Sequence, residues 1–70
     1  MRFIKGLSHE TINLLKRIYA QSKYSHVRRR AHCILLSHEG YQTKELMNIF
    51  DVSIVTIYNW FNAWEELNLV

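Results

Sequence analysis

The residue types that catalyse reactions or bind metals are present in this chain, but their spacing supports neither chemistry. The four histidines lie too far apart for any two to share a helix face at i, i+3 or i, i+4. They are His9, His26, His32 and His38. Cys33 is the only cysteine, and no His and acid pair lies beside it to activate a thiolate. Glu65 and Glu66 are adjacent, and adjacent residues of a helix point apart. The sequence therefore predicts no catalytic residue, metal site, cofactor or small-molecule substrate, with Cys33 in the core and the histidines at the surface.

The charge distribution indicates a polyanionic partner. The chain has nine Lys/Arg and six Asp/Glu, a net charge of +3. All nine basic residues and only two acidic ones precede Glu45, so residues 1–44 carry +7 and residues 45–70 carry −4. Clustered positive charge binds phosphates and releases their counterions. The residues expected to contact phosphates in this basic half are Arg2, Lys5, Arg28, Arg29, Arg30 and Lys44.

Length and composition predict one small globular domain. Seventy residues, 49% of them hydrophobic, are near the lower limit for a core that folds without disulfides or metals. The apolar runs are far shorter than the roughly 20 residues of a membrane helix. The N-terminus also lacks the apolar segment of a secretory signal. A cytoplasmic location without membrane contact is expected.

Proline is absent and apolar residues recur at helical spacing, which predicts an all-α fold of four helices. The predicted helices span about residues 8–21, 25–39, 43–50 and 53–67. Residues 1–7 are expected to form a free basic arm before a helical domain at 8–70. Such an arm suits the narrow minor groove of A·T tracts.

Capping residues set the predicted boundaries of the first two helices. Ser8 and Ser25 are expected to be N-caps, because their side chains can accept a backbone N–H of the first turn. Gly40 is expected to end the second helix in a left-handed conformation, with Tyr41 folding back onto Leu36 in a Schellman motif.

The apolar stripes of the four predicted helices define the expected core. Its expected members are Ile12, Leu15, Ile18, Tyr19, Val27, Ala31, Ile34, Leu35, Leu46, Ile49, Phe50, Ile57, Trp60, Phe61, Trp64 and Leu67.

The short connection between the third and fourth predicted helices indicates a helix-turn-helix. About three residues, Asp51 to Ser53, are too few for a near-antiparallel hairpin, so the helices must cross at a wide angle. Counted from Thr43, the apolar positions of the usual helix-turn-helix pattern are all filled by apolar residues. These residues are Leu46, Phe50, Val52, Ile57 and Trp60. Met47 replaces the usual small residue and Asp51 the usual turn glycine, and Asp51 is expected to adopt the left-handed conformation with Ser53 capping the next helix.

The outward face of the fourth predicted helix supplies candidate contacts to DNA bases. Asn pairs bidentately with adenine, and Thr and Ile contact the thymine methyl group. Because residues 45–70 contain no Lys or Arg, the commonest contact to guanine is missing and a preference for A·T-rich double-stranded DNA is expected. Ser53 and Tyr58 are expected to contact phosphates. The expected base contacts are Ile54, Val55, Thr56, Asn59 and Asn62.

Several short segments carry a family resemblance. They are Arg30-Ala31 followed by Ile34-Leu35-Leu36, then Glu39-Gly40-Tyr41, Lys44-Glu45-Leu46, Asp51-Val52-Ser53, and Thr56-Ile57-Tyr58-Asn59-Trp60-Phe61 with Trp64 behind. With them, the chain from Val27 onward resembles the N-terminal DNA-binding region of bacterial insertion-sequence transposases of the mariner superfamily. Members usually carry Arg or Lys in the recognition helix, often where Asn59 and Asn62 stand.

The resemblance implies a module that binds the terminal inverted repeats of a transposable element. In such transposases a separate acidic, metal-dependent domain cuts and joins DNA. Seventy residues leave no room for that domain, so this chain is expected not to be an enzyme itself. A bacterial protein that associates with the nucleoid when bound is expected.

Two alternatives remain open. A stand-alone helix-turn-helix repressor would require a homodimer, because one helix reads only a short half-site. A protein-interaction module would instead use an exposed apolar patch. That patch would consist of Trp64, Leu67, Leu69 and Val70.

Overall fold

The computed structural model describes residues 3–67, which form four helices and no strand. The helices are α1 (His9–Gln21), α2 (Ser25–His38), α3 (Thr43–Phe50) and α4 (Ile54–Leu67). Each boundary agrees with the predicted one to within one residue, and the all-α class is confirmed. Arg2, Leu69 and Val70 lie outside the described residues, as does the side chain of Leu67.

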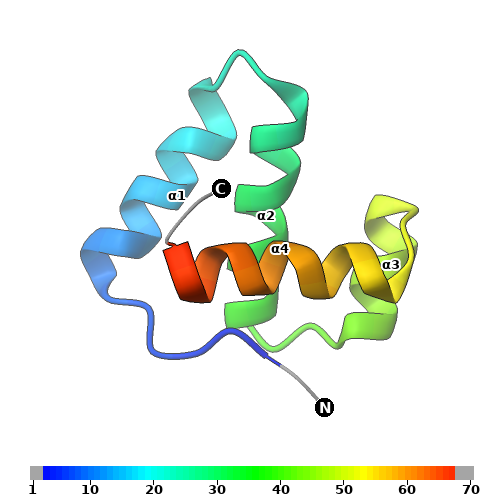
Figure 1. Cartoon of the computed structure of the whole chain (residues 1–70). Helices are drawn as coiled ribbons and strands as arrows, with labels where there is room; N and C mark the ends of the chain where they lie inside the picture. The colour runs from blue at the N-terminus through cyan, green and yellow to red at the C-terminus, as the bar shows by residue number, and fades with distance from the viewer. Residues whose placement is uncertain (1–2, 68–70) are drawn as a thin grey trace.

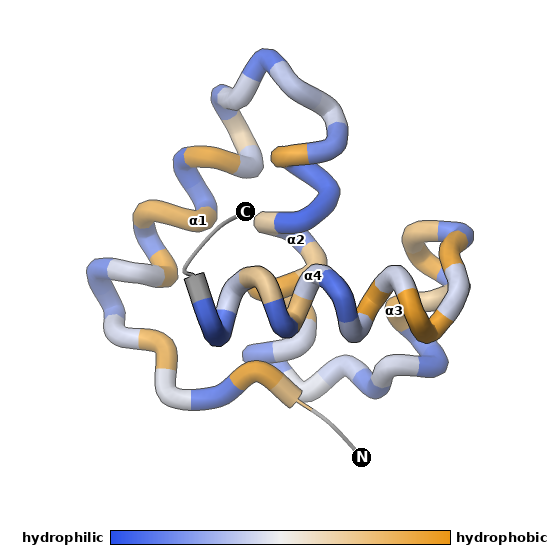
Figure 2. The backbone as a smooth tube through the Cα atoms, in the orientation of Figure 1, coloured by the Kyte–Doolittle hydropathy of each residue, from blue (hydrophilic) through white to orange (hydrophobic). Residues whose placement is uncertain are grey.

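The helices are arranged around α2, which contacts each of the other three. Figure 1 shows α1 and α2 joined by the loop at the top, α4 crossing α2, and α3 beside the N-terminal end of α4. In Figure 2, hydrophobic and hydrophilic residues alternate in short blocks along α1, as expected for a helix with one buried face. Within residues 3–67, no helix is both long and apolar enough to cross a membrane.

Burial of apolar side chains from all four helices and the N-terminal segment forms one core. The buried apolar residues are Ile4, Leu15, Ala31, Cys33, Ile34, Leu35, Leu46, Phe50, Ile57, Phe61 and Trp64. Two residues expected inside are exposed, Tyr19 to 40% and Ile49 to 48%. Four others are half-buried, namely Ile12, Ile18, Val27 and Trp60. The short helix α3 buries Leu46 and Phe50, and Ile49 falls on the flank of that stripe.

Local capping explains where α1 begins and α2 ends. The Ser8 hydroxyl accepts the backbone N–H of Thr11 at 3.1 Å, which confirms the predicted N-cap. Gly40 has φ +105°, and the Tyr41 N–H donates to the Leu36 carbonyl at 3.1 Å. The Gly40 N–H also donates to the Ser37 carbonyl at 3.1 Å, which completes the predicted Schellman motif.

The predicted N-cap of α2 is wrong by one residue. Tyr24 is the N-cap and Ser25 is the first helical residue. The Ser22 hydroxyl accepts the Tyr24 N–H at 3.3 Å, and the Tyr24 carbonyl accepts the Arg28 N–H at 3.1 Å. The first turn of α2 therefore starts without a side-chain cap of its own.

The turn between α3 and α4 has the predicted geometry. Asp51 ends α3 in the left-handed conformation, with φ 55° and ψ 52°. The Val52 N–H then donates to the Met47 carbonyl at 3.1 Å, and the Ser53 hydroxyl accepts the Thr56 N–H at 3.3 Å. Both predictions for this turn, the left-handed Asp51 and the Ser53 cap, are confirmed.

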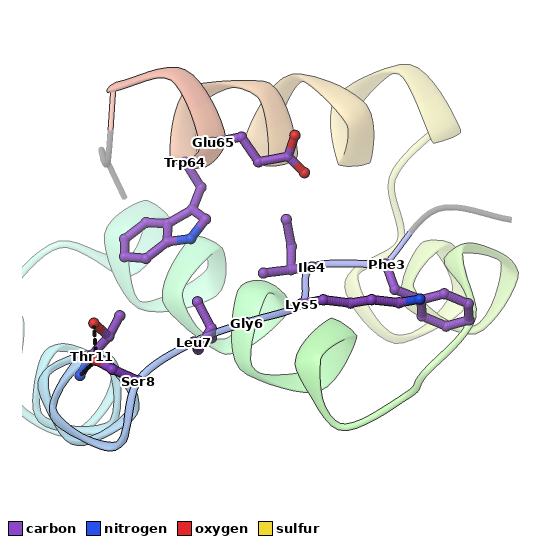
Figure 3. Close-up of a pocket in the computed structure, with 9 residues that line it drawn as sticks. All are labelled: Phe3, Ile4, Lys5, Gly6, Leu7, Ser8, Thr11, Trp64 and Glu65. Atoms are coloured by element: carbon purple, nitrogen blue, oxygen red, sulfur yellow. Dashed lines mark hydrogen bonds between the residues drawn. The ribbon is translucent and has the colours of Figure 1, made fainter.

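The N-terminal segment is docked on the helices, so the expectation of a free arm is wrong for residues 3–7. Ile4 is 3% exposed, and its N–H donates to the buried Ser37 hydroxyl at 2.8 Å. Figure 3 shows Ile4 and Leu7 of this segment on the side that faces Trp64 of α4. Burying Ile4 and satisfying the Ser37 hydroxyl outweigh the conformational freedom of the segment.

Candidate DNA interface

The orientation of α4 is fixed by the residues that it buries. Ile57 and Phe61 are fully buried, and Trp64 is 9% exposed. With 3.6 residues per turn, the opposite face of the helix is formed by Val55, Asn59 and Asn62. All three are exposed, Val55 to 63%. Three of the five predicted base contacts therefore share the outer face of α4.

The other two predicted base contacts lie near the start of α4. Ile54, the first helical residue, is 39% exposed. Thr56 is half-buried, and its hydroxyl lies 3.3 Å from the Ser53 hydroxyl. Ser53 also accepts the Thr56 N–H, so both hydroxyls take part in the cap of α4.

Aromatic side chains flank the exposed face of α4. Tyr58 is half-buried, with its ring centroid 6.3 Å from that of Phe61. Trp60 is also half-buried, and its ring meets Phe50 edge-on at 5.9 Å between centroids. Residues two positions apart in an α-helix are separated by about 200° around its axis, so Tyr58 and Trp60 lie on opposite flanks of α4. Trp60 thus belongs to the edge of the core rather than its centre.

Arg29 joins α2 to the helix-turn-helix. Its Nη2 donates to the carbonyl of Phe50, the last residue of α3, and its guanidinium lies 5.9 Å from the ring centroid of Trp60. A helix C-terminus leaves its last carbonyls without partners, and a cation there also interacts favourably with the helix dipole. Arg29 therefore positions α3 and α4 with one donor while other guanidinium donors stay available.

Arg28 and Arg30 are both half-buried on α2. Arg28 Nη1 donates to the Ser22 carbonyl in the α1–α2 loop at 2.5 Å. The Arg30 Nε is buried and has no hydrogen-bond partner among residues 3–67. The three consecutive arginines therefore have different surroundings.

The predicted phosphate-contacting lysines lie on other elements. Lys44 is exposed in the first turn of α3. Lys5 is exposed on the N-terminal segment, with its Nζ 6.0 Å from the Phe3 ring centroid. In the view of Figure 1 that segment passes below α4, and the N-terminal half of α2 lies above it.

The histidines and Cys33 have different degrees of burial. Burial raises the pKa of the Cys33 thiol to about 12, so the thiol is protonated at neutral pH, and the prediction of a core cysteine is confirmed. His9 and His26 are exposed, but His32 and His38 are half-buried rather than at the surface as expected. Among residues 3–67, no three His, Cys, Asp or Glu side chains are placed to hold a metal ion.

His32 lies where three helices meet. Its ring packs edge-on against Tyr19 of α1 at 4.3 Å between centroids, and against Phe50 of α3 at 5.4 Å. Burial lowers the pKa of His32, and the charge of Glu39 opposes that shift. The imidazole is therefore predominantly neutral at pH 7 and acts first as a packing group.

Trp64 is one of the four residues of the apolar patch required for the protein-interaction alternative, and it is not exposed. Trp64 is buried against the core, beside Ile4 and Leu7 of the N-terminal segment in Figure 3. The other proposed members of that patch lie outside the described side chains.

A comparison with known protein families matches residues 26–69 to the homeodomain-like domain. The match covers α2, α3 and α4 and more than half of the chain, and the chain belongs to this helix-turn-helix family. Membership identifies a DNA-binding domain that is not itself catalytic. No curated protein and no solved structure matches the chain.

Proposed function

We propose that this chain is the N-terminal DNA-binding part of a transposase and recognises the terminal inverted repeats of a transposable element. Two observations support the proposal. The homeodomain-like family to which the chain belongs is found in transposases. The segments between Val27 and Trp64 also resemble those of bacterial insertion-sequence transposases.

In this proposal, α4 lies in the major groove and its outer face contacts bases. The groove admits one α-helix, and each base pair presents a distinct pattern of donors, acceptors and methyl groups there. Asn59 and Asn62 pair with adenines, and Val55 and Ile54 contact thymine methyl groups. The absence of Lys and Arg from residues 45–70 makes guanine a poor target, so the preferred DNA is rich in A·T.

Phosphates are held by the elements around α4. Arg28 and Arg29 contact one backbone from the α2 side, and Lys5 contacts the other from the N-terminal segment. The two phosphate backbones border the major groove on its two sides, which matches cations on both flanks of α4. Further proposed phosphate contacts are Arg2, Arg30, Lys44, Ser53 and Tyr58. The observation that carries the proposal is an exposed helix face without Lys or Arg, with Arg29 against its flank at Trp60.

Selection of bound duplexes from a random pool tests this function. The expected result is an A·T-rich motif that the chain prefers over a scrambled duplex at physiological salt. A pool that stays random, with affinity that falls steeply with salt, would show phosphate binding without base contacts by α4.

The symmetry of the selected motif separates a transposase module from a repressor. A monomer reading one end sequence selects a short asymmetric motif. A homodimeric repressor selects two inverted half-sites separated by about one helical turn of DNA. A palindrome, together with a dimer in sedimentation equilibrium, would therefore favour the repressor.

A further inference from the structure

A groove between the end of α1 and the start of α2 has the composition of an anion site. We call it the α1–α2 groove, and its lining contains no acidic residue. It is lined by Tyr19, Ala20, Ser25, Arg28, Arg29 and His32. Two guanidinium groups, two hydroxyl groups and one imidazole are thus brought to a single concave surface by two helices.

The two arginines of the groove are already ordered without an acidic partner. Arg28 is held by the Ser22 carbonyl and Arg29 by the Phe50 carbonyl, and within residues 3–67 neither forms an ion pair. Each hydrogen bond uses one donor of a planar guanidinium that has five. Ordering the side chains in advance removes much of the entropy that an anion would otherwise lose on binding.

The groove borders the DNA-binding face. Arg29, which lines it, also lies against Trp60 on one flank of α4. His32, which also lines the groove, packs against the rings of Tyr19 and Phe50, which holds the imidazole in place. An anion held by Arg29 in the groove would therefore lie near Trp60 of α4.

We propose that the α1–α2 groove binds a single phosphate group, held by Arg28 and Arg29 with the Ser25 hydroxyl as an additional donor. In the complex with DNA this is one backbone phosphate at the edge of the major groove that α4 occupies. That second statement rests on the proposed DNA-binding function. Bidentate donation from guanidinium to phosphate is the interaction that the paired arginines supply.

Side-chain NMR of the isotope-labelled chain tests the groove with two probes, inorganic phosphate and a 16-base-pair duplex that contains the selected motif. With both probes, the Nε–H signals of Arg28 and Arg29 and the amide of Ser25 should shift and saturate. The Nε–H of Arg17, which is exposed on α1 outside the groove, should not shift. Equal shifts at Arg17 and Arg28 would show diffuse charge attraction and overturn the groove.

The two probes separate the failure of the groove from the failure of DNA binding. If the duplex binds and shifts α4 while the groove signals stay unchanged, the groove is wrong and the proposed function stands. If phosphate saturates the groove but no duplex binds, the groove is an anion site and the proposed function fails.

Substitutions give a second measure. Arg28→Ala should weaken duplex binding about tenfold, as expected for loss of a charged hydrogen bond, and Ser25→Ala a few-fold. Arg17→Ala should change affinity less than twofold. The Ser25 hydroxyl takes part in none of the hydrogen bonds within residues 3–67, so Ser25→Ala tests the groove even if Arg28→Ala impairs folding through its contact with Ser22. Unchanged affinity in a folded Ser25→Ala variant, with Arg28→Ala no weaker than Arg17→Ala, would contradict the proposal.

Discussion

The exposed face of α4 and the N-terminal half of α2 lie near each other but differ in charge. α4 presents Val55, Asn59 and Asn62, all uncharged, whereas α2 presents Arg28 and Arg29. In many DNA-binding helices one arginine contributes both base recognition and phosphate attraction. In the proposed complex the two contributions come from different elements, so selectivity and salt-dependent affinity should change one at a time.

The largest expected effect comes from removing the core residue that supports both regions. Phe61 is fully buried, and Phe61→Ala should lower the free energy of unfolding by about 3–5 kcal/mol. That is a large fraction of the roughly 5–15 kcal/mol typical of a domain, so DNA binding and phosphate binding should be lost together. Urea unfolding followed by circular dichroism measures the change. Phe61→Leu, the control, should cost about 1.5 kcal/mol or less, and equal costs for the two variants would contradict close packing here.

The second-largest expected effect comes from a substitution on the exposed face of α4, which should change selectivity alone. Asn59→Ala should weaken binding to the selected motif by about 1–3 kcal/mol and leave binding to a scrambled duplex unchanged. Asn59 is exposed, so stability should not change. Fluorescence anisotropy titration of both duplexes measures this effect. Asn13→Ala, on an exposed position of α1, is the matched control, and equal losses on both duplexes would argue against base contact by Asn59.

The third expected effect comes from substituting both arginines of α2, which should change mainly the salt dependence of binding. Replacing Arg28 and Arg29 with Ala should flatten the dependence of log K on log salt concentration by about two phosphate contacts. The motif should still be preferred over a scrambled duplex, but the preference should narrow because Arg29→Ala also removes the bond to the Phe50 carbonyl that positions α4. The matched control is Lys16→Ala with Arg17→Ala, which removes the same charge from exposed positions of α1 and should leave the slope nearly unchanged. The same flattening in both double variants would mean that only net charge matters.

The smallest effect concerns the turn that joins α3 to α4. Asp51 is exposed with φ 55°, a conformation that glycine adopts without strain. Asp51→Gly should raise the free energy of unfolding by up to about 1 kcal/mol, whereas Asp51→Ala should lower it by about as much. Both variants remove the same charge. The difference between their stabilities in thermal unfolding therefore reports the cost of the left-handed backbone conformation at position 51. If Asp51→Gly were less stable than Asp51→Ala, the backbone at Asp51 would not be strained.

Local sequence rules were sufficient for the helices and for most of their ends. Ser8, Gly40, Asp51 and Ser53 act through bonds to backbone groups a few residues away, and each was predicted correctly. The exception, Ser25, was displaced by one position because Ser22 holds Tyr24 extended.

Contacts between distant segments were not predictable from spacing. Ile4 bonds to Ser37 across 33 positions, and Arg29 bonds to Phe50 across 21. A single sequence shows that Ile4 is apolar and Arg29 is basic. Which residue each of them contacts depends on how α2 packs against the N-terminal segment and against α3. The docked segment and the bridging role of Arg29 therefore appear only in the structure, and the individual DNA contacts remain predictions.

The most direct test is the selectivity of the unmodified chain as a function of salt. Affinities for the selected motif and for a scrambled duplex would be measured between about 50 mM and 200 mM salt. If α4 supplies the selectivity and the basic residues supply the salt-dependent affinity, the affinities for both duplexes should fall in parallel as salt rises. The ratio of the two affinities should then stay constant. A ratio that falls toward one as salt rises would show that the same charges supply both, and would contradict the separation of α4 from its basic surroundings.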